Sequence, residues 1–304
     1  MLYWLLVILL GLLAIPLVQE ATRDRVKAQR SAAPGQFAEL SRGNVHYQWF
    51  GPERGPVAVC VHGLTTSSYV WEGMVQGLAL MGYRVLVFDH YGRGFSDRPR
   101  GAQNAAFYVA ELDELLAHEA VDGPVSLIGY SMGGAVAAAY AAAHPDSVSR
   151  VTLIASAGLQ DPPGGIADFI RRVPVLGDWL MLAAYPWMLR AGIRAERDLP
   201  SAVPDIAKRQ LAELDLRGFV PAVLSSLRGI LSAPLEGEHK AIHAAGIPVH
   251  AIWGAHDALI PEKARAALAQ WNPQAVQDVI ADGTHAITYS HADEILRLMR
   301  AQAG

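Results

Sequence analysis

The chain has 304 residues, of which 52% are hydrophobic and 18% are charged, so it can bury a large core in one domain with an inserted subdomain. Its formal net charge of -4 gives no excess of positive charge for binding nucleic acid, so no nucleic-acid partner is expected. The single cysteine, Cys60, excludes an internal disulfide and is expected to be a buried core thiol.

The first 18 residues contain no charged side chain, and as a helix they would span about 26 Å, the short end of what a bilayer needs. A cleaved signal peptide is disfavoured, because no Lys or Arg precedes this stretch and no small-residue cleavage site follows Val18. A buried core helix is the other alternative. We expect a transmembrane anchor at residues 1–18, a juxtamembrane segment at residues 19–38, and a protein held in a bacterial inner membrane.

Four basic residues follow the apolar stretch: Arg23, Arg25, Lys27 and Arg30. By the positive-inside rule they would hold the body on the cytoplasmic side, although so short a segment leaves the side of the membrane open. Residues 19–30 lack Gly and Pro and could continue the helix until residues 31–35 break it. No stripe of small residues stands out in the apolar stretch, so a homodimer remains an open alternative.

Beyond the anchor, short apolar segments rich in β-branched residues alternate with amphipathic segments. This alternation predicts an α/β fold with a mostly parallel sheet and helices on both faces. Residues 45–50 alternate in polarity and predict an edge strand. The further expected strands are 57–61, 84–88, 125–128, 150–155, 249–253 and 275–280. The expected helices are 70–81, 105–120, 135–143, 261–270 and 291–302.

The interval 159–245 breaks this rhythm, because it holds helical patches and no convincing strand. It therefore predicts a helical cap inserted into a core formed by residues 39–158 and 246–304. The patches are 166–173, 176–191, 206–216 and 220–231. Most of their large apolar side chains are expected to pack the cap onto the sheet, and the rest to form a lid over an apolar substrate.

Residues 129–134 read Gly-Tyr-Ser-Met-Gly-Gly and lie between an expected strand and an expected helix. A serine in so tight a turn has a strained backbone conformation. Gly129 and Gly133 make the turn possible because they lack the Cβ atoms that would collide with the strand and the helix. Such a match also arises by chance in loops, but this context favours Ser131 as a nucleophile. The amide of Met132, in the first turn of a helix, can then hold an oxyanion.

A serine nucleophile needs a base within hydrogen-bond reach and an acid that orients the base. His285 lies in a turn directly after the last expected strand, and Asp257 follows the strand before it, so both would reach the sheet edge at which Ser131 lies. Asp89 also follows a strand and is the main rival of Asp257. His62 follows a strand too, but its glycine neighbour indicates that it shapes a loop.

These motifs resemble those of α/β-hydrolases: His-Gly at 62–63, the turn around Ser131, Gly-x-x-Asp-x-x-x-Pro at 254–261 and Gly-x-His-Ala at 283–286, in the order Ser, Asp, His. The resemblance covers roughly residues 40–304 and implies that the second oxyanion amide belongs to Leu64. Serine at the turn tells against epoxide hydrolases and haloalkane dehalogenases. An apolar anchor joined to this body resembles membrane-bound monoacylglycerol lipases and bacterial phospholipases A.

Together these features predict a membrane-anchored serine carboxylic-ester hydrolase that acts on acylglycerols, lysophospholipids or phospholipids through an acyl-enzyme. No cofactor and no metal are expected. His239 and His243 have helical spacing, but a solvated face of the cap explains them better than a metal. Two alternatives stay open: C–C bond hydrolysis of vinylogous diketones with the same triad, and a ligand-binding receptor that keeps the triad with little turnover.

Overall fold

The computed structural model describes residues 1–302 and contains an eight-stranded sheet in the order β1-β2-β4-β3-β5-β6-β7-β8. The pairs β1–β2 and β2–β4 are antiparallel and all other neighbours are parallel. The predicted α/β class with a mostly parallel sheet is therefore confirmed. The strands are β1 (Gln36–Leu40), β2 (Gly43–Phe50), β3 (Val57–Val61), β4 (Arg84–Phe88), β5 (Val125–Tyr130), β6 (Val148–Ile154), β7 (Val249–Gly254) and β8 (Val276–Ile280).

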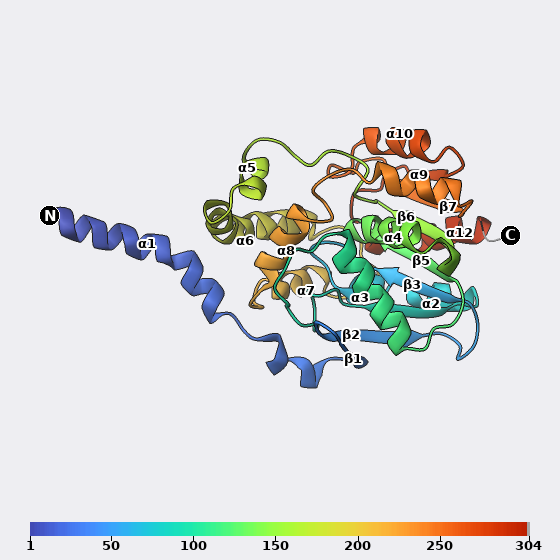
Figure 1. The fold of residues 1–304 in the computed structure, drawn as a ribbon, viewed down its shortest axis with the longest axis horizontal. Coiled ribbons are helices and arrows are strands. Elements are labelled where there is room, and N and C mark those ends of the chain that lie inside the picture. The colour runs from blue at the N-terminus through green and yellow to red at the C-terminus, as the bar shows by residue number, and fades with distance from the viewer. Residues whose placement is uncertain (303–304) are drawn as a thin grey trace.

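Side chains along the central strands alternate between the two faces of the sheet, as the two-residue period of a strand requires. Val59 and Leu127 belong to one hydrophobic cluster, whereas Cys60 and Ile128 belong to the other. The first cluster is completed by α3 (Ala105–His118), α4 (Met132–Ala143), α9 (Glu236–Ala244) and α10 (Glu262–Trp271). The second is completed by α2 (Val75–Leu80), α11 (Ile287–Ser290) and α12 (Ala292–Ala301), so helices cover both faces (Figure 1).

The N-terminal edge of the sheet differs from the sequence prediction. The segment now called β2 was expected to be an edge strand, and this is wrong because β1 pairs with it on the outer side. Only Ala38 of β1 is fully buried, so this strand carries little apolar signal. The helix predicted at residues 70–81 is interrupted, because a 3-10 turn, Ser68–Trp71, precedes the shorter helix α2. The closing helix predicted at 291–302 is confirmed as α12, and the short helix α11 precedes it.

The helices α5 (Ile166–Arg172), α6 (Leu176–Glu196), α7 (Ile206–Glu213) and α8 (Phe219–Arg228) lie between β6 and β7 in the chain. Met181, Leu214 and Phe219 are buried in a hydrophobic cluster of their own, and this cluster is the centre of the cap. Helix α9 behaves differently, since it packs against α4 and α10 on the face of the sheet.

His239 on α9 is only 1% exposed and stacks against Trp271 with the ring centroids 6.2 Å apart. The solvated face predicted for it is therefore wrong, because the inner side of α9 faces the core helices rather than water. Burial lowers the pKa of His239 to about 4, so this imidazole is neutral near pH 7.

Helix α1 (Leu2–Thr22) projects away from the rest of the molecule (Figure 1). Its segment Tyr3–Thr22 is long and apolar enough to be a candidate membrane span, and only 6% of its apolar window is buried. The helix ends at Thr22 and does not continue through residues 23–30, which instead form two short 3-10 turns beginning at Val26 and Arg30.

The chain leaves α1 through backbone bonds to the cap. The Asp24 amide donates to the Asp215 carbonyl oxygen at 3.0 Å, and the Arg217 amide donates to the Asp24 carbonyl oxygen at 2.9 Å. Further up the helix, Trp179 Nε1 of α6 donates to the Leu13 carbonyl oxygen at 2.7 Å. The candidate anchor thus contacts the cap at two positions along the chain, at Leu13 within α1 and at Asp24 just after it.

Candidate active site

Ser131 lies at the turn between β5 and α4, with φ 53° and ψ -118°, a region that side-chain-bearing residues rarely adopt. The neighbouring glycines make this turn sterically possible. A Cβ on Gly133 would collide with the Val61 carbonyl oxygen of β3, and a Cβ on Gly129 would collide with the Gly133 carbonyl oxygen. Two glycines therefore let α4 approach the sheet closely enough to hold the Ser131 hydroxyl beyond the end of β5.

The structure brings Ser131, Asp257 and His285 together at the carboxyl ends of the strands. His285 Nε2 lies 2.9 Å from Ser131 Oγ, and His285 Nδ1 lies 2.8 Å from Asp257 Oδ2. The carboxylate can accept only from Nδ1–H, and this tautomer directs the lone pair of Nε2 at the serine hydroxyl. The arrangement can transfer the hydroxyl proton to the imidazole as the oxygen attacks an electrophile.

The carboxylate of Asp257 is held by backbone donors as well as by His285. Its Oδ1 accepts hydrogen bonds from the Leu259 amide at 2.8 Å and the Ile260 amide at 2.9 Å, and the side chain is only 2% exposed. These bonds fix the orientation of the carboxylate, which in turn fixes the plane of the imidazole.

Tyr130 is a neighbour of His285 that the sequence did not single out. Its hydroxyl donates to the His285 carbonyl oxygen at 3.1 Å, and the two rings lie 5.4 Å apart. The position between Gly129 and Ser131 was the available signal, since a residue at the end of β5 must lie beside the nucleophile. Tyr130 thus supports the loop that carries the base.

The rival acid, Asp89, lies in a different set of contacts. It is fully buried and accepts hydrogen bonds from His46 Nδ1 at 2.8 Å, the Ser68 amide at 2.8 Å and the Phe95 amide at 2.9 Å. Burial alone would raise the pKa of Asp89, but the hydrogen bond and charge of His46 outweigh it and hold that pKa below its usual range. Asp89 therefore organises the loop after β4, whereas Asp257 meets the imidazole.

Both candidate oxyanion residues adjoin the turn. Met132 is the first residue of α4, where helix geometry leaves an amide without an intrahelical partner, and Leu64 lies in the loop after β3. His62 holds this loop: its Nδ1 lies 2.8 Å from the Gly63 carbonyl oxygen, and its Nε2 accepts from the His90 amide at 2.9 Å. Burial lowers the pKa of His62 well below its ordinary value, so the neutral ring serves the loop.

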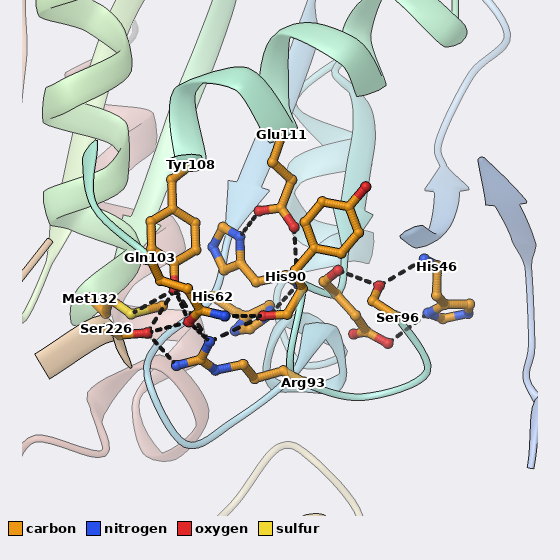
Figure 2. A network of polar contacts seen from close by, with 12 residues as sticks. His46, His62, His90, Arg93, Ser96, Gln103, Tyr108, Glu111, Met132 and Ser226 are labelled. Carbon is orange, nitrogen blue, oxygen red and sulfur yellow. Dashed lines mark hydrogen bonds and ion pairs between the residues drawn. The ribbon is translucent and has the colours of Figure 1, made fainter. Parts of the chain in front are cut away.

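A buried arginine joins this loop to the cap, and sequence reasoning missed it (Figure 2). Arg93 is fully buried, and its Nε donates to the Leu64 carbonyl oxygen at 3.1 Å. Its Nη1 donates to Gln103 Oε1 and its Nη2 to Ser226 Oγ of α8, each at 2.7 Å. Figure 2 shows the Tyr108 hydroxyl in contact with both this guanidinium and the Met132 side chain. The network links both candidate oxyanion residues to one cap helix.

Within residues 1–302, no group of three or more His, Cys, Asp or Glu side chains is arranged to hold a metal ion. The chemistry described above needs none, since the base, the orienting acid and the amide donors are all supplied by the polypeptide.

Comparison with known proteins places the chain among related enzymes. It is 26% identical over 271 residues to cis-3-alkyl-4-alkyloxetan-2-one decarboxylase of Xanthomonas campestris, which covers 83% of this chain and 89% of that protein. It is 28% identical over 263 residues to pimeloyl-[acyl-carrier protein] methyl ester esterase of Vibrio parahaemolyticus, which covers 84% and 97%.

Among solved structures, a bacterial membrane phospholipase A superposes with a TM-score of 0.69 at 20% identity, covering 99% of this chain and 95% of that one. At so low an identity this similarity concerns the fold alone. The family model described as alpha/beta hydrolase fold matches residues 56–292. The chain therefore belongs to the α/β hydrolase fold family.

Proposed function

We propose that this chain is a membrane-anchored serine hydrolase that cleaves carboxylic esters of lipids, such as acylglycerols, lysophospholipids or phospholipids. The observation that carries the proposal is the continuous pair of contacts from Ser131 Oγ to His285 Nε2 and from His285 Nδ1 to Asp257 Oδ2. Relatives named as esterases support the same class of reaction.

In the proposed mechanism, Ser131 Oγ attacks the ester carbonyl while His285 takes the hydroxyl proton. Asp257 fixes the tautomer of the imidazole and stabilises its positive form. The amides of Met132 and Leu64 hold the tetrahedral oxyanion, each contributing about 3 kcal/mol if well aimed. The alcohol leaves with the proton from His285, and water then hydrolyses the acyl-enzyme by the same steps.

The proposal of a lipid substrate is supported by how the cap meets α1. Trp179 donates to the carbonyl oxygen of Leu13, which lies about 14 Å along the helix from Thr22 at the usual rise per residue. If α1 spans the bilayer, this end of α6 lies at the depth of the acyl chains. Val175 and Leu176, at that end, are 80% and 50% exposed, as suits a surface in contact with lipid.

The test is turnover of p-nitrophenyl esters of increasing acyl length, followed by fatty-acid release from a monoacylglycerol, a lysophospholipid and a phospholipid. Ser131→Ala should lower kcat by about 10⁴ or more. Ser156→Ala is the matched control, because Ser156 is buried after the neighbouring strand β6 and its hydroxyl bonds only to the Ala157 carbonyl oxygen within residues 1–302. This control should keep activity within about threefold of the parent protein.

A loss of less than about 100-fold in Ser131→Ala would overturn the nucleophile assignment. Preferential cleavage of dienoate diketones over esters would instead favour C–C hydrolysis. Saturable ester binding without product would favour a receptor. Labelling by a membrane-impermeant fluorophosphonate, compared between intact cells and lysate, would report which side of the membrane carries Ser131.

A further inference from the structure

A concave site that contains none of the triad residues lies beside the end of α1. It is a groove of about 700 Å³ formed by the last turn of α1, the following 3-10 turn, the loop after β4 and the start of α8. Nothing in the proposed hydrolysis uses it. Its volume is within the range of small-molecule sites and is much larger than a single bound ion needs.

The groove is lined by five basic side chains: Arg25, Lys27, Arg98, Arg100 and Arg217. Within residues 1–302, none of the five forms an ion pair with an acidic side chain. All but Arg98 are exposed. Such a concentration of unneutralised positive charge in a concave surface attracts anions and is costly to leave without a counter-charge.

Only two acidic residues line the groove, and both are neutralised by arginines outside it. Glu20 pairs with Arg23 and accepts from the Gly218 amide at 2.6 Å. Asp97 pairs with Arg30 at 2.8 Å and accepts from the Asn44 amide at 2.8 Å. The acids thus leave the positive charge of the lining uncompensated.

Arg98 differs from the other four basic residues of the groove, because its side chain is partly buried and held by the backbone. Two of its nitrogens bond to the carbonyl oxygens of Gly94 and Ser96, which fixes the guanidinium. Its Nε is shielded from solvent and has no acceptor among the described residues. Because this Nε is out of reach of a ligand in the groove, Arg98 contributes a fixed positive charge to the lining rather than a free donor, and this charge favours an anionic ligand.

We propose that this groove binds the phosphate headgroup of an anionic phospholipid in the leaflet beside the end of α1. The inference rests on the proposed membrane anchor and not on the proposed ester hydrolysis. The location favours a lipid over a soluble phosphate, because Glu20 belongs to the last turn of the candidate span and the groove therefore lies at headgroup depth.

The experiment uses the full-length chain carrying Ser131→Ala, so that no lipid is consumed, in micelles of a neutral detergent. Isothermal titration calorimetry compares dioctanoyl phosphatidylglycerol, dioctanoyl phosphatidylcholine, glycerol 3-phosphate and inorganic phosphate. The anionic lipid is expected to bind at least tenfold more tightly than the other three probes. The two soluble phosphates separate recognition of a free anion from recognition of a lipid.

The variant Arg25→Gln/Lys27→Gln/Arg217→Gln removes three exposed cations whose side chains make no ion pair within residues 1–302. Each removal is expected to weaken binding of the anionic lipid by about fivefold, so the triple variant should lose its preference over phosphatidylcholine. The matched control, Arg54→Gln/Lys263→Gln/Arg300→Gln, removes the same charge from exposed positions outside the groove and should keep the preference.

Equal affinity for the two lipids, or equal losses in the two triple variants, would overturn the groove as a headgroup site. Tighter binding of inorganic phosphate than of the lipid would also overturn it and indicate a soluble ligand. Flotation with neutral vesicles tests the anchor separately, because the triple variant keeps α1 unchanged. Failure of every variant to float would contradict the anchor, and intact ester hydrolysis in the triple variant with Ser131 restored would leave the proposed chemistry standing.

Discussion

Arg93 Nε donates a hydrogen bond of 3.1 Å to the carbonyl oxygen of Leu64, and this bond fixes the loop after β3 from its buried side. The same guanidinium holds Ser226 Oγ of α8 at 2.7 Å. Arg93 is fully buried and makes no ion pair within residues 1–302, so removing its charge from water costs free energy. Nearly all N–H donors of its guanidinium must therefore find acceptors in the protein.

We expect Arg93→Lys to lower kcat by about 10- to 100-fold with a smaller change in KM, because one ammonium cannot hold both Leu64 and Ser226. Ser226→Ala removes the bonds of this hydroxyl to Arg93, Gln103 and Tyr108 but leaves the bond to Leu64, so it should cost less than about fivefold in kcat. Steady-state kinetics on a short-chain ester, with circular dichroism to verify folding, separates the two. Equal losses of kcat would show that the bond to Leu64 has no special part in turnover.

Asp257→Asn should lower kcat by about 10⁴ with little change in the free energy of unfolding, because the amide favours the wrong tautomer of His285. Asp89→Asn should instead affect stability more than turnover. It should lower the free energy of unfolding by about 2–4 kcal/mol, since the charge facing buried His46 is lost, while kcat changes less than about tenfold. Kinetics and urea unfolding measure both, and the opposite ranking of the two kcat losses would make Asp89 the acid.

Gly133→Ala should destabilise the protein by about 1–3 kcal/mol or prevent folding, because the added methyl group collides with the Val61 carbonyl oxygen. Gly192→Ala is the control. Gly192 lies within α6 with open space around a Cβ, so this change should raise the free energy of unfolding by about 0.5–1 kcal/mol. Midpoints of urea unfolding would reveal the contrast, and a fully stable Gly133→Ala protein would contradict the close approach of α4 to β3.

Glu111 predicts a pH dependence of stability. Its carboxyl lies 2.6 Å from His90 Nδ1, and burial raises its pKa to about 8. The folded protein therefore binds this proton between about pH 4.5 and 8 when the unfolded chain does not, so stability falls as the pH rises through that window. The wild-type protein should lose up to about 1.4 kcal/mol per pH unit relative to Glu111→Gln.

Urea unfolding of both proteins from pH 5 to 8 measures this difference, and the contributions of titratable groups that do not contact Glu111 largely cancel because both proteins contain them. A wild-type stability that rises relative to the variant over the same range would show that Glu111 is ionised in the folded state.

The sequence predicted the parts of the site that local patterns mark. Ser131 and Asp257 each follow a buried apolar strand and His285 lies after β8, and parallel strands bring their carboxyl ends to one edge. Arg93 carried no such signal, because an arginine between two glycines resembles an exposed loop residue. Its burial depends on Ser226, 133 residues further along the chain.

The same limit explains the errors at β1 and His239. Ala38 is the one fully buried residue of β1, so no alternation of large apolar side chains marks this strand. His239 is covered by Trp271 of α10, and no local pattern could indicate that contact. Local periodicity predicts helices and strands, whereas contacts between residues far apart in the chain decide which of their side chains are buried.

The bonds from Asp24 to Asp215 and Arg217 tie the exit of α1 to the covering helices. If α1 spans a bilayer, as proposed above, a change in bilayer thickness that tilts the helix would pull on α6 and on the 215–217 loop before it reaches the central strands. Such a tilt would therefore shift the helices of the cap, while the position of Ser131 stays set by the sheet.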